Sequence, residues 1–296
     1  MKLRNAFSMI ELIFVIVVMG IIGKFGVEFL AQAYKSFIFT SVNNELQQNS
    51  ANALEFIGAR LQYRIKDSTI ARVSTGSAPI AIGSATGSDI KVLEWVAEDI
   101  DGLRGTTAPT WGGIIDLDAG SKAALELPAS DLTAVDSMIQ DLTGSTTVDN
   151  PALFFIGANS DIQTGYGWDP AFPITDQQGA MHPIDTSSGA TTQAVSSIAG
   201  VDFSNIDVYE YFKLAWTANA LVYTPGTNGK GTLTFYYNYQ PWLGETLTDA
   251  NTKSAILMEN VSTFRFVSLG SVVKIQICVK SDVVEEYSLC KEKTIF

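Results

Sequence analysis

The sequence predicts an α+β fold in which one long N-terminal helix packs against an antiparallel β-sheet head. Three observations predict it. Residues 12–23 form an unbroken apolar run behind a short basic leader. Residues 41–66 then carry apolar side chains at spacings of three and four, which is the period of an amphipathic helix. From residue 68 onward, short segments of β character recur between connections rich in Gly, Ser, Thr and Asp.

Composition indicates a folded protein that does not bind nucleic acid. The 296 residues are 46% hydrophobic and 10% aromatic, which is enough apolar material to bury the core of one large domain or two. The formal net charge is −12, whereas a nucleic-acid surface needs a basic footprint. We interpret the acidity as a contribution to solubility.

The apolar run is expected to cross a membrane once. It is shorter than the ~20 residues that span a bilayer comfortably, but the helical pattern continues through residues 25–30, so a tilted span is long enough. Lys2 and Arg4 precede the run, and the positive-inside rule therefore places the N-terminus in the cytoplasm and everything after the span outside it.

Glu11 is a lone carboxylate at the head of this run. A charged side chain at the bilayer centre costs roughly 2.5–3.5 kcal/mol on insertion scales, so such a residue needs a partner. The best candidate partner is an amine. A cut between Ala6 and Phe7 would create an α-amino group four residues before Glu11, and one charge would then neutralise the other, within a subunit or between neighbours.

Residues 5–12 (NAFSMIEL) resemble the cleavage and methylation motif of type IV prepilins and type II secretion pseudopilins. That family has a basic leader, a small residue before the cut, a Phe after it, and Glu as the fifth residue of the mature chain. Ala6 stands where the family nearly always has Gly. The resemblance implies that a prepilin peptidase cuts after Ala6, that the amine of Phe7 is methylated, and that Glu11 serves assembly.

The resemblance also implies a type IV pilin-like fold. Its parts would be a leader (1–6), the transmembrane half of the helix (7–30), its amphipathic half (31–66) and a mainly β head (67–296). The helix of roughly 55 to 60 residues would be on the order of 85 Å long. Its first half would form the filament core. Its second half would turn an apolar stripe to the sheet and leave a polar face in solvent or against other subunits, with Gln47, Gln48, Glu55 and Gln62 on that face.

A second resemblance concerns residues 256–266 and the strands after them, which look similar to the C-terminal sheet of J-type minor pseudopilins and W-type minor pilins. It implies a minor subunit at or near a filament tip, of a type IV pilus or of a type II secretion pseudopilus. Its partners would be other pilin or pseudopilin subunits, the prepilin peptidase and the inner-membrane assembly platform. The chain would be a single-pass inner-membrane protein with a periplasmic head before it enters the filament.

A secretory signal is the competing interpretation of the N-terminus, because a basic start, an apolar core and an A-x-A site describe one too. Ala31 and Ala33 supply that site, and cleavage after Ala33 would release a soluble protein that starts at Tyr34. The charges of Glu11, Lys24 and Glu28 are unusual in a signal peptide, so we favour the prepilin motif.

The rest of the chain predicts short strands, a hairpin and one further helix. The hairpin turns at the Gly-rich residues 225–231, and the helix covers residues 130–142. Residues 143–200, which are poor in charge and rich in small residues, predict a loop-rich insertion. We interpret it as a structural insertion fixed by its own aromatic residues, with an adhesive or ligand-binding surface as the alternative. Strands are expected at 90–96, 113–117, 152–156, 208–216, 220–223, 232–239, 263–267, 272–279 and 283–289.

The only two cysteines, Cys278 and Cys290, predict one disulfide in an oxidising compartment, closing a loop of about a dozen residues for roughly 3 kcal/mol. A tight hairpin turning at residues 281–282 would set Cys278 opposite Glu285. The bridge therefore needs a longer turn or a crossing segment.

No catalytic motif is apparent, and we expect the chain not to be an enzyme and to need no cofactor. The only histidine, His182, lies in a Pro-containing context that predicts a loop, with no nucleophile motif around it. Oxygen donors in loops could bind Ca²⁺, but the EF-hand pattern is missing, so the indication of a calcium site is weak. The loop carboxylates are Asp99, Asp101, Asp116, Asp118, Asp161, Asp169, Asp176 and Asp185.

Overall fold

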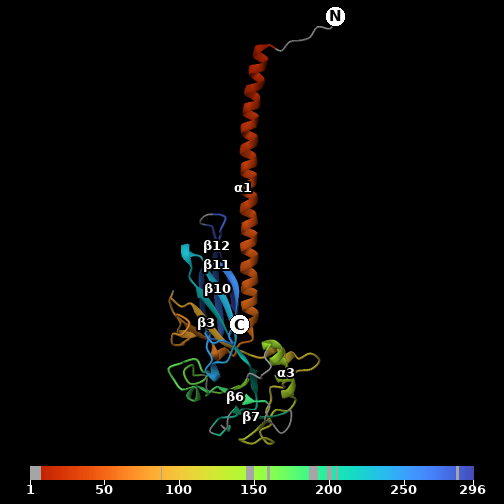
Figure 1. The fold of residues 1–296 in the computed structure, drawn as a ribbon, viewed down its shortest axis with the longest axis vertical. Coiled ribbons are helices and arrows are strands. Elements are labelled where there is room, and N and C mark those ends of the chain that lie inside the picture. Colours follow the sequence, from red (N-terminus) through yellow and green to blue (C-terminus); the bar gives the residue numbers. More distant parts are fainter. Residues whose placement is uncertain are drawn as a thin grey trace.

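The computed structural model has one long helix that projects far beyond a mainly β head (Figure 1). It describes residues 8–87, 89–144, 150–158, 161–186, 193–198, 202–204, 206–284 and 287–296. The helix α1 (Met9–Gln62) has 54 residues, slightly fewer than the sequence predicts. Together with the antiparallel sheets of the head, this helix confirms the α+β fold class.

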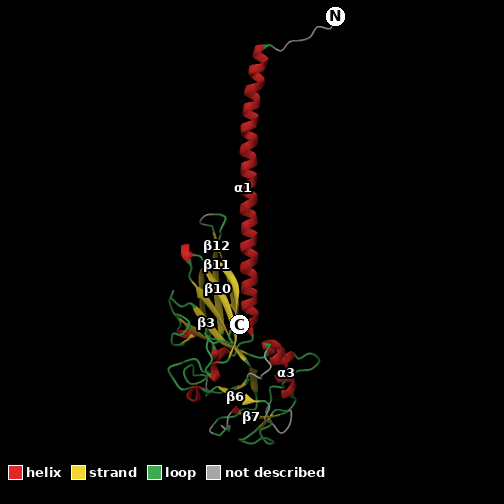
Figure 2. Cartoon of the chain, viewed as in Figure 1, coloured by secondary structure: helices red, strands yellow, loops and turns green. Residues whose placement is uncertain are grey.

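Two antiparallel sheets make up the head (Figure 2). Within the described residues the larger sheet has eight strands in the order β13-β12-β11-β10-β9-β3-β1-β2. Their bounds are β1 (Ile70–Arg72), β2 (Ile80–Ala81), β3 (Val92–Ala97), β9 (Thr217–Thr224), β10 (Gly231–Tyr239), β11 (Lys253–Leu269), β12 (Val272–Lys280) and β13 (Ser288–Ile295).

The smaller sheet has five described strands in the order β4-β7-β6-β5-β8. It lies at the end of the head opposite the N-terminus, next to α3 (Figure 1). The strands are β4 (Leu125–Glu126), β5 (Ala152–Phe155), β6 (Met181–Asp185), β7 (Ala194–Ser197) and β8 (Phe212–Ala215).

Two further described α-helices are α2 (Ile100–Arg104) and α3 (Leu132–Thr143). The described 3₁₀ turns are η1 (Lys66–Ser68), η2 (Ile82–Ser84), η3 (Ile174–Gln177), η5 (Thr227–Gly229) and η6 (Pro241–Leu243).

The amphipathic half of α1 packs on the larger sheet as its periodicity predicts. Its first buried residue is Val42, and Leu54, Ile57 and Leu61 follow at helical spacing. They join a core with the sheet residues Leu93, Trp95, Phe235, Ile275 and Ile277. The predicted polar face is exposed throughout. This half of the helix is thus held by burial of one apolar stripe.

Polar contacts fix how α1 lies along β13. The hydroxyl of Tyr287 donates to Asn43 Oδ1 at 2.6 Å, and Lys291 Nζ donates to the carbonyl of Gln47 at 2.9 Å. About two turns further along α1, Glu55 forms an ion pair with Lys293. The C-terminal strand is therefore the one that lies beside the helix.

The helix ends four residues earlier than residue 66, where the apolar pattern ends. Tyr63 is its C-cap, and the next residue, Arg64, forms an antiparallel bridge with Ala97. The amide of Ile65 then donates to the carbonyl of Val96 at 3.0 Å. The backbone therefore leaves the helix here and pairs with the sheet. Ile65 is buried, but it lies after the end of the helix.

Helix α3 matches the helix predicted at residues 130–142. Asp131 is the N-cap and accepts hydrogen bonds from the amides of Thr133 and Ala134. Gly144 ends the helix in the left-handed conformation, with φ at 69°, which glycine adopts without the usual steric penalty. Val135 and Ile139 face the core of the smaller sheet.

Several strand predictions differ from the structure. Residues 113–117 form only isolated bridges, Ile114 with Tyr211 and Asp116 with Glu126. The predicted strand at 263–267 is the second part of β11, whose 17 residues pair first with β10 and then with β12. Asn260, with φ at 58°, lies between the two parts.

The strand predicted at 283–289 lies instead at 288–295. The amide of Ser281 donates to the carbonyl of Tyr287 at 2.9 Å, so the connection after β12 runs from 281 to 287. This longer turn shifts β13 toward the C-terminus. A tight turn at 281–282 would have left too few residues for this register.

The described part of residues 143–200 consists mostly of turns and loops, and short strands lie among them. The described part contains β5, β6 and β7, which supply three of the five strands of the smaller sheet. The aromatic residues Tyr166 and Trp168 are buried, as the structural interpretation expects. The sequence predicts a strand at 152–156, which corresponds to β5, but it does not predict β6 or β7.

Candidate functional site

The first half of α1 is the most unusual surface of the molecule. No residue from 8 to 41 is buried by the rest of the chain. Large apolar side chains cover all sides of this half, and Phe14, Ile16 and Phe29 are among those exposed to 60% or more. The helix is long and apolar enough to cross a membrane. Water is a poor environment for such a surface, and the helix is compatible with a single-pass membrane anchor.

The charged residues of this segment are few. Lys24 and Glu28 lie one turn apart, with Nζ and Oε1 separated by 3.9 Å. Glu11 lies at the helix start, where Ser8 is the N-cap. The amide and the hydroxyl of Ser8 both donate to Glu11 Oε2 at 2.9 Å, and the amide of Glu11 donates back to Ser8 Oγ at 3.4 Å.

These bonds form a capping box, which satisfies donors that a helix start otherwise leaves unpaired. The Ser-x-x-Glu spacing of Ser8 and Glu11 indicates this role in the sequence. Glu11 thus has a local partner in the single chain. Ala6 and Phe7, the predicted cleavage and methylation residues, lie outside the described residues.

The competing signal-peptide site lies within α1. Ala31 and Ala33 are in an unbroken run of helix from Met9 to Gln62. The helix continues from the apolar half into the half that packs on the sheet, and it contains no linker between them.

The predicted disulfide is present. Cys278 and Cys290 lie directly opposite each other on β12 and β13, and their sulfur atoms are 2.06 Å apart. The long turn at 281–287 makes this register possible, which is one of the two solutions that the sequence left open. The disulfide links β13, the strand that lies against α1, to its neighbour β12.

The candidate calcium ligands do not come together. Among the residues that the structure describes, no group of three His, Cys, Asp or Glu side chains is arranged to hold a metal ion. Several of these carboxylates hold turns instead. Asp116 accepts from the amides of Asp118 and Ala119 at 3.0 Å, and Asp161 accepts from those of Gln163 and Thr164.

His182 is not a loop residue, contrary to the sequence prediction. It lies in β6 with 4% of its surface exposed, and its ring stacks on Phe155 with the ring centroids 5.0 Å apart. Burial lowers the pKa of its imidazole to about 4, so the ring is neutral at pH 7. The histidine packs in the core as an aromatic side chain, which the preceding Met and following Pro do not reveal.

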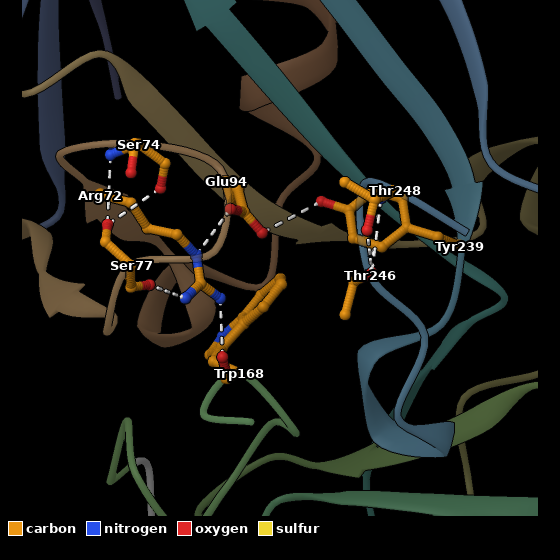
Figure 3. Close-up of polar contacts among 8 residues, drawn as sticks. All are labelled: Arg72, Ser74, Ser77, Glu94, Trp168, Tyr239, Thr246 and Thr248. Carbon is orange, nitrogen blue, oxygen red and sulfur yellow. Dashed lines mark hydrogen bonds and ion pairs between the residues drawn. The ribbon is translucent and has the colours of Figure 1, made fainter. Parts of the chain in front are cut away.

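A buried ion pair joins the larger sheet to the segment around Trp168 (Figure 3). Arg72 Nε donates to Glu94 Oε1 at 2.8 Å, and Tyr239 donates its hydroxyl proton to Glu94 Oε2 at 3.3 Å. Arg72 also donates to the carbonyls of Trp168, at 2.7 Å, and Ser77. Burial raises the pKa of the Glu94 carboxyl, and the Arg72 guanidinium opposes this rise.

This cluster has a structural role, because it connects strands of the larger sheet to the segment around Trp168. Each charge is buried and its partner is present, and removing one partner from such a pair typically costs about 3–5 kcal/mol. The sequence offered no sign of it, because Arg72 and Glu94 are separated by 22 residues and lie on different strands.

Asp99 is a second buried carboxylate. It caps α2 by accepting from the amide of Gly102 at 3.0 Å, and its other oxygen accepts from the indole nitrogen of Trp111 at 3.2 Å. Burial raises the pKa of Asp99 to about 6, although these hydrogen bonds oppose the rise.

Comparisons of the chain with protein-family models, with curated proteins and with solved structures found no match.

Proposed function

We propose that this chain is a minor subunit of a type IV pilus or of a type II secretion pseudopilus, located at or near the filament tip, and that it acts by assembly rather than by catalysis. The observation that carries the proposal is the division of α1. Its first half is apolar on all sides and free of the head, and its second half is amphipathic and packed on the sheet.

A free apolar half of this length suits two environments in turn. In the bilayer it meets lipid, and its backbone is fully paired within the helix, as a membrane requires. In a filament, helices of neighbouring subunits would replace the lipid. The same surface therefore serves a stored state in the membrane and an assembled state.

The N-terminal residues give the proposed order of events. The prepilin peptidase cuts after Ala6 and methylates the amine of Phe7. During assembly Glu11 exchanges its contact with Ser8 for the Phe7 amine of a neighbouring subunit. A carboxylate without such a partner would be costly in an apolar filament core.

The size of the head supports a position at the tip. The described part of residues 67–296 forms two sheets, and the smaller one lies at the end of the head opposite the N-terminus (Figure 1). A head of this size fits poorly in a repeating shaft, whereas one end of a filament has room for it.

The mass of the mature N-terminus tests the proposal. The protein is isolated from membranes of its host, and its N-terminal peptide is measured by mass spectrometry. A chain that starts at methylated Phe7 supports the proposal. A chain that starts at Tyr34 would identify a secreted soluble protein, and a chain that retains Met1 would contradict processing altogether.

A further inference from the structure

A cavity of about 670 Å³ lies where the last turns of α1 meet α2 and the strands β9 and β10. Its volume is within the range of pockets that bind small molecules. It belongs to the head, well beyond the apolar half of the helix, so assembly through α1 does not account for it. The lining comes from both sides of the junction between helix and sheet.

The walls of the cavity are aromatic and accessible. Phe56, Tyr63, Trp216 and Tyr237 line it, and each is half-buried. Flat apolar faces of this kind stack against the C–H faces of sugar rings, because both surfaces are apolar and well matched in size. Other aromatic residues of the head, such as Trp95 and Tyr239, are fully buried and serve the core.

Two guanidinium groups lie at the same cavity and have no carboxylate partner among the described residues. Arg60 Cζ is 5.6 Å from the centroid of the Phe56 ring, and Arg104 Cζ is 5.9 Å from that of Tyr63. Neither forms an ion pair with a described residue. Stacking on a ring orients the guanidinium and leaves its N–H groups available, and their planar arrangement matches a carboxylate.

A buried amide adds a third polar contact. Asn219 on β9 lines the cavity with only 3% of its surface exposed, and its side chain makes no hydrogen bond to a described residue. A ligand hydroxyl group would supply the donor or acceptor that the fold does not.

Acidic groups complete the lining. Glu98, Asp99 and Asp101 line the same cavity as the two arginines, and Glu98 is paired with Lys213 at 2.6 Å. Carboxylates accept hydrogen bonds from hydroxyl groups.

We propose that this cavity binds an acidic saccharide, meaning a pyranose ring that carries a carboxylate, as in uronic acids. Its C–H face stacks on the aromatic walls, its carboxylate binds Arg60 and Arg104, and its hydroxyl groups bind Asn219 and the acidic side chains. An aromatic acid would stack equally well but has no hydroxyl groups for Asn219. A neutral sugar would leave both guanidinium groups unpaired.

The test is binding of defined oligosaccharides to the full-length protein in detergent, measured by calorimetry and by saturation-transfer NMR. The probes are trimers of galacturonate, glucuronate and mannuronate, together with the same trimers after reduction of each carboxylate to the alcohol. We expect saturable binding of at least one uronate trimer and roughly tenfold weaker binding of its reduced form, the size of effect that a lost charge-assisted hydrogen bond produces. Absence of binding by all three trimers, or equal binding of the reduced forms, would overturn the proposal.

Variants then locate the site. Arg60→Met and Arg104→Met keep the aliphatic stem over each ring, and each should weaken binding about tenfold or more without a change in melting temperature. Arg265→Met is the matched control, because Arg265 is an exposed arginine on β11 outside the cavity. Asn219→Ala tests the hydroxyl contact separately. It should weaken binding without lowering the melting temperature, since no hydrogen bond to a described residue is lost. Unchanged affinity in both arginine variants and in Asn219→Ala would also overturn the proposal.

Discussion

In the proposed assembly Glu11 has two partners at different stages. In the single chain its carboxylate accepts from the amide and hydroxyl of Ser8, while the proposed assembly requires the amine of a neighbour. The two roles are compatible because a capping box is worth only about 1 kcal/mol, far less than a charge pair in an apolar environment.

Glu11→Val should therefore insert into the membrane normally but enter filaments poorly, with a loss of about tenfold or more. The valine side chain suits lipid and removes only the assembly partner. Membrane fractionation and immunoblotting of sheared filaments measure the two steps. Ser8→Ala is the control, because it removes the cap hydroxyl and keeps the carboxylate. Equal incorporation of Glu11→Val and wild type would remove Glu11 from the mechanism.

Asp99 makes the stability of the head dependent on pH. Its pKa is raised from 3.8 to about 6 in the folded state, so between these values the folded protein holds a proton that the unfolded chain has lost. The free energy of unfolding contributed by this group therefore falls as pH rises from about 4 to about 6, by about 3 kcal/mol in all.

Asp99→Asn should abolish this part of the pH dependence, since the amide does not titrate. Urea unfolding of the full chain in detergent at several pH values measures the effect. Asp101→Asn, on the exposed side of the same helix, is the control. A wild-type curve that is flat from pH 4 to 6, or an unchanged slope in Asp99→Asn, would be inconsistent with a buried ionisable carboxyl.

At the scale of elements, the second half of α1 stabilises the head by burying apolar side chains, and the first half contributes nothing to the stability of the head. Leu61 is fully buried against the sheet, whereas Ile16 is 62% exposed. Leu61→Ala should lower the free energy of unfolding of the head by about 2–5 kcal/mol, because it leaves a cavity. Ile16→Ala is the matched control, and it should change head stability by less than about 0.5 kcal/mol. Equal effects in denaturant melts would mean that the halves are not independent.

The disulfide acts on the strand beside α1. Cys278 and Cys290 are 12 residues apart in sequence, and a loop of this size is worth about 3 kcal/mol on the chain-entropy model. Cys278→Ser with Cys290→Ser should therefore reduce stability by about 2–3 kcal/mol in chemical denaturation. Wild type under reducing conditions should match the double variant. A double variant as stable as the oxidised wild type would mean that the strand pairing alone holds β13.

At the scale of the whole molecule, the head should fold without the apolar half of the helix. Residues 8–35 contribute no buried residue, and the ring contact of Phe39 with Tyr287 is retained when the chain begins at residue 36. Deletion of residues 1–35 should give a soluble protein whose melting temperature matches that of the full chain in detergent. Aggregation of this fragment, or a fall of more than a few degrees, would show that the first half stabilises the head.

The sequence revealed those features whose signals are local. The long apolar helix, the amphipathic stripe through Leu54 and Leu61, the helix at Leu132–Thr143 and the hairpin at 225–231 depend on neighbouring residues, and the structure contains each of them. The strand at 283–289 was misplaced because its register depends on a turn closed by Ser281 and Tyr287. His182 was misassigned because its partner, Phe155, is distant in sequence.

By itself the sequence determined the long helix, its division into an apolar and an amphipathic half, and the pairing of the only two cysteines, since periodicity and composition are properties of a continuous segment. The tertiary structure alone decided which residues meet across the fold. It brought Arg72 to Glu94, and it placed Arg60, Arg104 and Asn219 around one cavity. Such contacts join segments far apart in the chain, and only the packing of helix and sheets fixes their distances.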